Sequence, residues 1–277
     1  MNRRVLPRVA AGLLAALAFA ARGAMLQPTD DPATSAVWLK VRASLFDNRA
    51  VQPAPAGWLA LEAPARAIDA AVVPVAIRAH LPREGGGPAV RLYLVIDANP
   101  SPISAIFEFA PGSPLTEVET RVRVDDYSVV RAIAETADGR LYGVTRFVKA
   151  SGGCSAPAGS DAAAAAASLG QMRFRIDGDP AGREPLRAQL LISHPNHSGM
   201  AMDQATRQFT PAHYVRKVDV AYRGQPVFSA DVDFSMSENP SFRFPLQPQG
   251  AGELRATVVD SQGRRFEAVQ ALGRAAP

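Results

Sequence analysis

The sequence predicts an all-β protein built from two β-sandwiches in tandem, with one short helix ahead of them. Segments with strand patterns recur along most of the chain, and proline and glycine separate them. A hairpin pattern also recurs late in each half. With 277 residues, of which 47% are hydrophobic and 20% charged, the chain has enough length and core-forming material for two domains.

Residues 1–23 have the composition of an export signal. Three arginines, at positions 3, 4 and 8, precede an apolar stretch over residues 9–20 that is too short to span a bilayer. We expect this segment to be removed, after Ala20 or after Gly23, and the protein to be periplasmic. The Arg3-Arg4 pair leaves both the Sec route and the twin-arginine route open.

The charge balance argues against nucleic acid and anionic membranes as partners. Removal of residues 1–20 takes away three arginines and no acidic residue, which lowers the formal net charge from +4 to +1. The basic character of the chain therefore belongs largely to the signal. We expect no membrane span in the mature protein.

The first domain is expected over residues 30–150. It begins with a helix up to Phe46, for which Thr34 or Ser35 is the capping residue. Strand patterns follow, and Asp138-Gly139 marks a hairpin between the last two. Residues 117–124 alternate as in a half-buried strand, with Arg123 on the polar face. The expected strands cover residues 72–77, 90–96, 106–109, 117–124, 129–136 and 141–148.

Residues 151–168 form the boundary between the domains. This segment is rich in glycine, serine and alanine, and Ala162 to Ala167 predict either a short helix capped by Asp161 or a loose tether. The second domain is expected over residues 169–277. Its strands are predicted at residues 172–176, 186–193, 214–222, 227–234, 242–244, 254–260 and 264–269. A hairpin motif repeats at a separation of 124 positions, as in Arg131 and Arg255.

The chain has one cysteine, Cys154, so no internal disulfide can form. Gly152 and Gly153 precede it, and small residues follow it. Glycine gives the backbone freedom, so this composition predicts a mobile arm with an exposed thiol. Such a thiol is suited to carrying a covalently bound group into a partner's active site, because it combines a nucleophile with reach.

A second cluster combines His194, His197, Met200 and Met202 within nine residues. Imidazole and thioether groups suit copper, so a copper-binding accessory protein is the alternative function. The structural interpretation is a turn after a strand, in which His194 bonds nearby backbone and Met200 packs. No hydrolase elbow, phosphate-binding loop or zinc-protease motif is present, so we expect no catalytic site and no cofactor or metal.

Two segments resemble a known family. Lys149-Ala150-Ser151-Gly152-Gly153-Cys154 is similar to the Gly-Gly-Cys arm of the SoxY sulfur carriers, and the loop from Ile192 to Met200 is similar to the His-Pro-x-x-x-Gly loop of the SoxZ partner. The order resembles the fused SoxYZ-like carriers associated with quinoprotein dehydrogenases. Residues 62–74 also resemble that fused family.

This resemblance implies two immunoglobulin-like sandwiches, the first ending in the carrier arm, and a covalent sulfur adduct on Cys154. It implies partners among periplasmic redox or sulfur-processing enzymes, including a quinoprotein dehydrogenase system. The second domain would dock on the first and help present the arm. This sequence departs from the family in two ways: its arm is internal, and Ser-Ala-Pro follows the cysteine where the family has Gly-Gly.

Overall fold

The structure is a computed structural model that describes residues 31–273, except residues 83–84, 111–115, 158, 160, 180–183 and 204–205. The predicted export signal lies outside these described residues. The helical elements are a 3-10 turn, η1 (Pro32–Thr34), and two helices, α1 (Ala36–Phe46) and α2 (Ala162–Ser168). No helix in the described ranges is long and apolar enough to cross a membrane.

Among the described residues, the first half of the chain contributes eight strands. They are β1 (Val51–Pro53), β2 (Leu59–Glu62), β3 (Val73–Ala79), β4 (Ala89–Ile96), β5 (Ile103–Phe109), β6 (Thr116–Val122), β7 (Ser128–Thr136) and β8 (Leu141–Val148). The second half contributes seven. They are β9 (Met172–Asp177), β10 (Leu186–Ile192), β11 (Val215–Tyr222), β12 (Gln225–Val232), β13 (Ser241–Leu246), β14 (Gly252–Asp260) and β15 (Arg265–Leu272). The all-β immunoglobulin-like class with a short helix near its start is confirmed.

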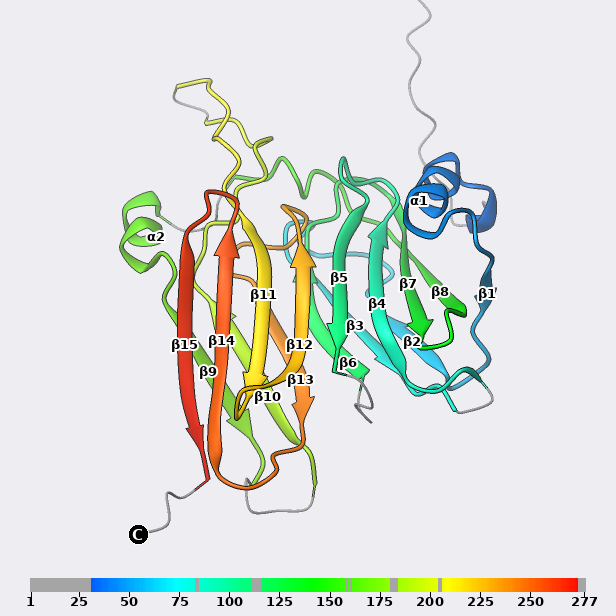
Figure 1. The fold of residues 1–277 in the computed structure, drawn as a ribbon. Helices are drawn as coiled ribbons and strands as arrows, with labels where there is room; N and C mark the ends of the chain where they lie inside the picture. Colours follow the sequence, from blue (N-terminus) through cyan, green and yellow to red (C-terminus); the bar gives the residue numbers. More distant parts are fainter. Residues whose placement is uncertain are drawn as a thin grey trace, which may run out of the picture.

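The two halves share both of their sheets (Figure 1). One sheet runs β1-β8-β7-β4-β5-β12-β11-β14-β15, and the other runs β2-β3-β6-β13-β10-β9. Two antiparallel pairs, β5 with β12 and β6 with β13, join the halves edge to edge. The second half thus extends the sandwich of the first, and each junction hides two sheet edges that would otherwise be open to pairing with other chains.

The internal repeat has a structural counterpart. Residues 128–136 of β7 and 252–260 of β14 are 124 positions apart, as are β8 and β15. The strand order β8-β7-β4-β5 in one half corresponds to β15-β14-β11-β12 in the other. The equivalent strands meet antiparallel at the junction, as expected for two copies related by an approximate twofold axis.

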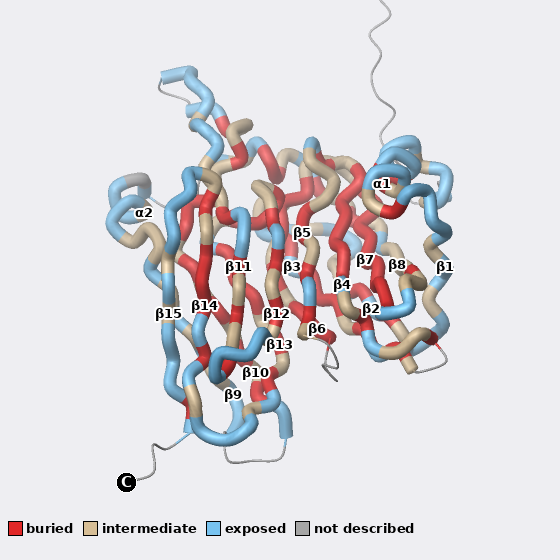
Figure 2. The backbone as a smooth tube through the Cα atoms, in the orientation of Figure 1, coloured by how far each residue is buried: buried red, intermediate tan, exposed pale blue. Residues whose placement is uncertain are grey.

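A buried apolar layer fills the space between the two sheets and continues across the junction (Figure 2). Phe242 of β13 contacts both Phe107 of β5 and Phe228 of β12 there, with ring centroids 6.2 Å and 6.5 Å away. Aromatic pairs of this kind add to the stabilisation from burial alone. The core therefore binds the two halves into one unit.

The capped-helix interpretations are confirmed at both sites. Ser35 accepts a hydrogen bond from the Trp38 N–H at 3.3 Å and begins α1. Asp161 accepts from the N–H groups of Ala163 and Ala164 at 3.0 Å and begins α2, so this stretch is a helix and not a loose tether. Helix α2 lies in the connection between β8 and β9.

Candidate functional site

Cys154 is fully buried, with a relative exposure of 0%. The prediction of a mobile arm with an exposed thiol is therefore wrong for this conformation. The chain leaves β8 and turns back to lie along residues 124–125, which follow β6. We call residues 150–155 the cysteine segment.

Backbone hydrogen bonds fix the cysteine segment to the loop after β6. The Gly152 N–H donates to the Asp125 carbonyl at 2.6 Å, and the Gly153 N–H donates to the Val124 carbonyl at 3.1 Å. The Cys154 N–H donates to Asp125 Oδ1 at 3.2 Å. Three consecutive donors are thus satisfied, and the segment is ordered despite its glycine content.

Gly153 is required here by lack of space. A Cβ atom on this residue would lie 2.5 Å from the carbonyl oxygen of Val124 and closer still to that of Ala70. Both obstacles are backbone atoms, which cannot rotate away. The glycine therefore permits close packing of three backbone segments, where the composition had suggested freedom of motion.

The second half of the chain completes the site with residues 194–199, which we call the histidine loop. The Ser198 hydroxyl donates to the carbonyl of Cys154 in a short hydrogen bond. Asn196 is fully buried; its side chain donates to the Met236 carbonyl at 2.7 Å and accepts from the Val215 N–H at 2.9 Å. The loop is therefore rigidly held where it touches the cysteine segment.

Arg123 links the two segments. Its guanidinium donates from Nη1 to the Gly153 carbonyl at 3.2 Å and from Nη2 to the Asn196 carbonyl at 3.3 Å. The sequence pattern placed Arg123 on the polar, solvent side of a strand, but the residue is only 3% exposed. The cysteine segment and the histidine loop cover it, and neither could be placed from the local pattern.

The surroundings keep the Cys154 sulfur neutral. Burial raises the pKa of the thiol to about 12, with Asp125 and Asp233 adding to the rise and Arg123 opposing it. Burial also raises the pKa of Asp233 to about 6, and its Oδ2 atom has no hydrogen-bond partner among the described residues. The resting thiol is protonated at neutral pH and hence a poor nucleophile.

His194, one member of the predicted group of two histidines and two methionines, lies in a cluster with His213 and Asp260. His194 packs edge-on against His213, with ring centroids 4.5 Å apart, and both rings face Asp260. His213 Nε2 lies 2.7 Å from Asp260 Oδ2, and His194 Nε2 lies 3.8 Å from it. Met202 is 40% exposed, and His197 exchanges two backbone hydrogen bonds with His213.

The hydrogen bonds of this cluster decide its chemistry. His194 Nδ1 accepts from the Asn196 N–H at 3.0 Å, so in the neutral ring Nε2 carries the proton and has no lone pair for a metal. Burial and the neighbouring His213 lower the pKa of His194 to about 4, which keeps the ring neutral. Within this cluster His213 bonds Asp260, and the neutral His194 ring packs against His213.

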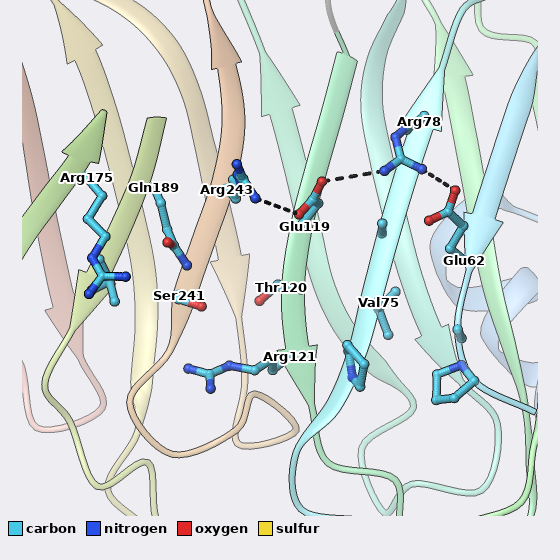
Figure 3. A pocket seen from close by; sticks show the side chains of 15 residues that line it. Glu62, Val75, Arg78, Glu119, Thr120, Arg121, Arg175, Gln189, Ser241 and Arg243 are labelled. Carbon is cyan, nitrogen blue, oxygen red and sulfur yellow. Dashed lines mark hydrogen bonds and ion pairs between the residues drawn. The ribbon is translucent and has the colours of Figure 1, made fainter. Parts of the chain in front are cut away.

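An open groove of about 740 Å³ crosses the junction of β6 and β13 on the face of the smaller sheet (Figure 3). Glu119 lies between Arg78 and Arg243, at 3.5 Å and 4.0 Å. Arg121 and Arg175 also line it, and Arg175 forms no ion pair among the described residues. The groove contains neither Cys154 nor any histidine, so it is separate from the cysteine site.

Comparisons with known proteins agree with this two-part construction. The model of the family described as sulfur oxidation protein SoxY matches residues 42–154, ending at Cys154, and that of sulphur oxidation protein SoxZ matches residues 175–271. A search of curated proteins found no match.

Two solved structures are similar to parts of the chain. The sulfur carrier protein SoxY from Chlorobium limicola f thiosulfatophilum is 28% identical, over 43% of this chain and 96% of that one, with a TM-score of 0.36. The fibronectin(III)-like modules of Clostridium thermocellum CbhA are 10% identical, over 77% and 90%, with a TM-score of 0.23. On the family matches, the chain is a SoxY domain fused to a SoxZ domain.

Proposed function

We propose that this protein is a carrier that holds a sulfur-containing group covalently on Cys154 while partner enzymes act on it. The observation that carries the proposal is the position of Cys154: it is the last residue of the SoxY match, and the SoxZ domain contacts it through Ser198. One domain supplies the thiol, and the other bonds the backbone carbonyl of the same residue.

A carrier needs two states, and the contacts of the cysteine segment suit both. In the closed state the free thiol is buried and protonated, which protects it from stray oxidants. In the open state the segment leaves residues 124–125 and the histidine loop, and offers the sulfur to a partner. The segment loses about five hydrogen bonds on opening, each with a net worth of about 1 kcal/mol.

The partners would be enzymes that process sulfur compounds. Joining the Cys154 thiol to a second thiol-type sulfur releases two protons and two electrons, so that loading step requires an oxidising partner. Transfer from a disulfide-type donor requires none. The periplasmic location rests on the N-terminal sequence, and a quinoprotein dehydrogenase system as partner rests on the family resemblance.

Labelling tests the proposal. The wild type and a Cys154→Ser variant are expressed in the native host, supplied with radiosulfur-labelled thiosulfate, and purified without reductant. We expect label on the wild type that a thiol reductant releases, and none on the variant. A wild type without releasable label, or equal label on the variant, would overturn the carrier function.

A further inference from the structure

Arg123 is a buried cation that forms no ion pair with any residue the structure describes. Arg123 is 3% exposed, and its guanidinium donates two hydrogen bonds to neutral backbone carbonyls. Its Nε atom has no hydrogen-bond partner among the described residues. No carboxylate of the described residues lies within ion-pair distance of it. A buried charge of this kind is costly unless an anion neutralises it.

The groups around Arg123 indicate where that anion would sit. Its Nη1 atom bonds the carbonyl of Gly153, the residue before Cys154. Burial lowers the pKa of Arg123, and of the charges that oppose this effect Cys154 is the strongest, ahead of Glu238 and Asp69. Arg123 in turn lowers the pKa of the Cys154 thiol, while burial, Asp125 and Asp233 raise it. The cation and the sulfur thus share one buried site.

We propose that Arg123 is the counter-charge for an anionic group carried on Cys154, and that it makes the closed site selective for anionic adducts over neutral and cationic ones. The inference rests on the proposed function of Cys154 as the attachment point. An adduct that ends in a negatively charged sulfur or sulfonate would neutralise the guanidinium when the segment closes. A cationic adduct would place like charges together in a buried site.

The preference for anionic adducts would depend on the positive charge of Arg123 outweighing the negative charges of Asp125 and Asp233. Asp125 accepts a hydrogen bond from the Cys154 N–H, which keeps its carboxylate near the sulfur in the closed state. Asp233 adds a second negative charge to the surroundings of the sulfur. Without Arg123 the site would be acidic and would favour cationic adducts. Arg123 is therefore a specificity-determining residue whose loss should invert the preference, which a purely structural role would not do.

An exchange equilibrium measures this preference directly. The protein is equilibrated with the disulfides of 2-mercaptoethanesulfonate, which is anionic, and cysteamine, which is cationic and of similar length. Intact mass then gives the ratio of the two mixed disulfides on Cys154, first on the folded protein and then in urea. Urea unfolds the protein and so abolishes the site. The ratio of the two mixed disulfides in urea is therefore the reference for the ratio on the folded protein.

In the wild type we expect folding to shift this ratio at least tenfold toward the anionic adduct. Arg123→Lys should keep the direction of the shift, and Arg123→Gln should reverse it. Arg175→Gln removes an equal charge from the separate groove and should leave the shift unchanged. Equal ratios for the folded and unfolded wild type would overturn the inference without any variant. So would an anionic preference that persists in a folded Arg123→Gln protein.

The two proposals fail in different ways. The groups in this exchange are installed chemically, so the result does not depend on a natural cargo. If the radiosulfur label is absent and the charge preference is present, the carrier function fails while the anion site stands. If the label is present and the charge preference is absent, the protein is a carrier whose closed site does not discriminate between adducts by charge.

Discussion

Gly153→Ala is the substitution that most sharply tests the packing of the cysteine segment. The added methyl group would meet the carbonyl oxygens of Val124 and Ala70 well inside van der Waals contact. Forcing an extra methyl into a packed site costs about 1–3 kcal/mol when neighbours can shift. Here the neighbours are backbone, so we expect the upper part of that range or release of the segment.

Detachment of the cysteine segment limits how much stability Gly153→Ala can remove. Detachment gives up the hydrogen bonds of Gly152, Gly153 and Cys154 to residues 124–125, and those from Arg123 and Ser198. At about 1 kcal/mol each, the ceiling is about 5 kcal/mol. The expected loss of stability is therefore about 2–5 kcal/mol, with the rest of the sandwich intact.

Thiol reactivity reports release directly. In the wild type, burial holds the pKa of Cys154 at about 12, whereas an exposed thiol has a pKa of about 8.5. Freeing the sulfur should raise its thiolate fraction at pH 8 roughly 2,000-fold, and the rate with Ellman's reagent should rise by two to three orders of magnitude. Urea unfolding and near-ultraviolet circular dichroism check that the fold persists.

Gly152→Ala is the matched control. This glycine has φ of +76°, but a Cβ there would meet only the Ser155 hydroxyl, at 3.7 Å. The cost is then conformational, about 1 kcal/mol, and thiol reactivity should rise about tenfold at most. If Gly153→Ala reacts no faster than Gly152→Ala and is equally stable, the close packing described for Gly153 is refuted.

Three other predictions concern the same site. Ser198→Ala removes the hydrogen bond to the Cys154 carbonyl. Opening of the cysteine segment should then cost about 1–2 kcal/mol less, and thiol reactivity should rise about tenfold. Unchanged reactivity would show that the histidine loop does not hold the segment. Because burial raises the pKa of Asp233 to about 6, the stability of the wild type should fall as pH rises from about 4 to 6. Asp233→Asn should therefore be about 1–3 kcal/mol more stable than the wild type at pH 7 and no more stable below pH 4. Urea titrations at both pH values measure this difference. The pKa of His194, lowered to about 4, gives stability that is present above pH 6.5 and is lost as pH falls toward 4, by about 3 kcal/mol. His194→Gln should lack this loss, so the difference in stability between wild type and variant should change between pH 7 and pH 4.5. The same difference at both pH values would contradict a buried, neutral His194.

Much of the fold could be predicted because its strands carry strong local patterns. The hairpin of β7 and β8 and its repeat in β14 and β15 follow from alternating residues around glycine turns. Two strands were missed. β1 has three residues and ends in proline, and its partner is the distant, parallel β8. β2 has four residues of modest strand propensity, and its pattern is short for a local prediction.

The candidate site was predictable in its chemistry and not in its geometry. The glycine pair and the single cysteine identify the segment, but nothing local reveals that residues 124–125 lie against it. Arg123 follows the alternation of a strand that faces water, and its burial depends on a loop more than 70 positions away. The partners of His194, which are His213 and Asp260, come together only through the strand order of the second half.

The intact mass of the protein shows whether Cys154 carries a group in the cell. The protein is isolated from the cells that make it, without reductant, and its mass is measured before and after a thiol reductant. We predict an added mass that maps to the peptide containing Cys154, disappears on reduction, and is absent from Cys154→Ser. A bare thiol in every preparation, from cells grown with and without reduced sulfur compounds, would contradict the account.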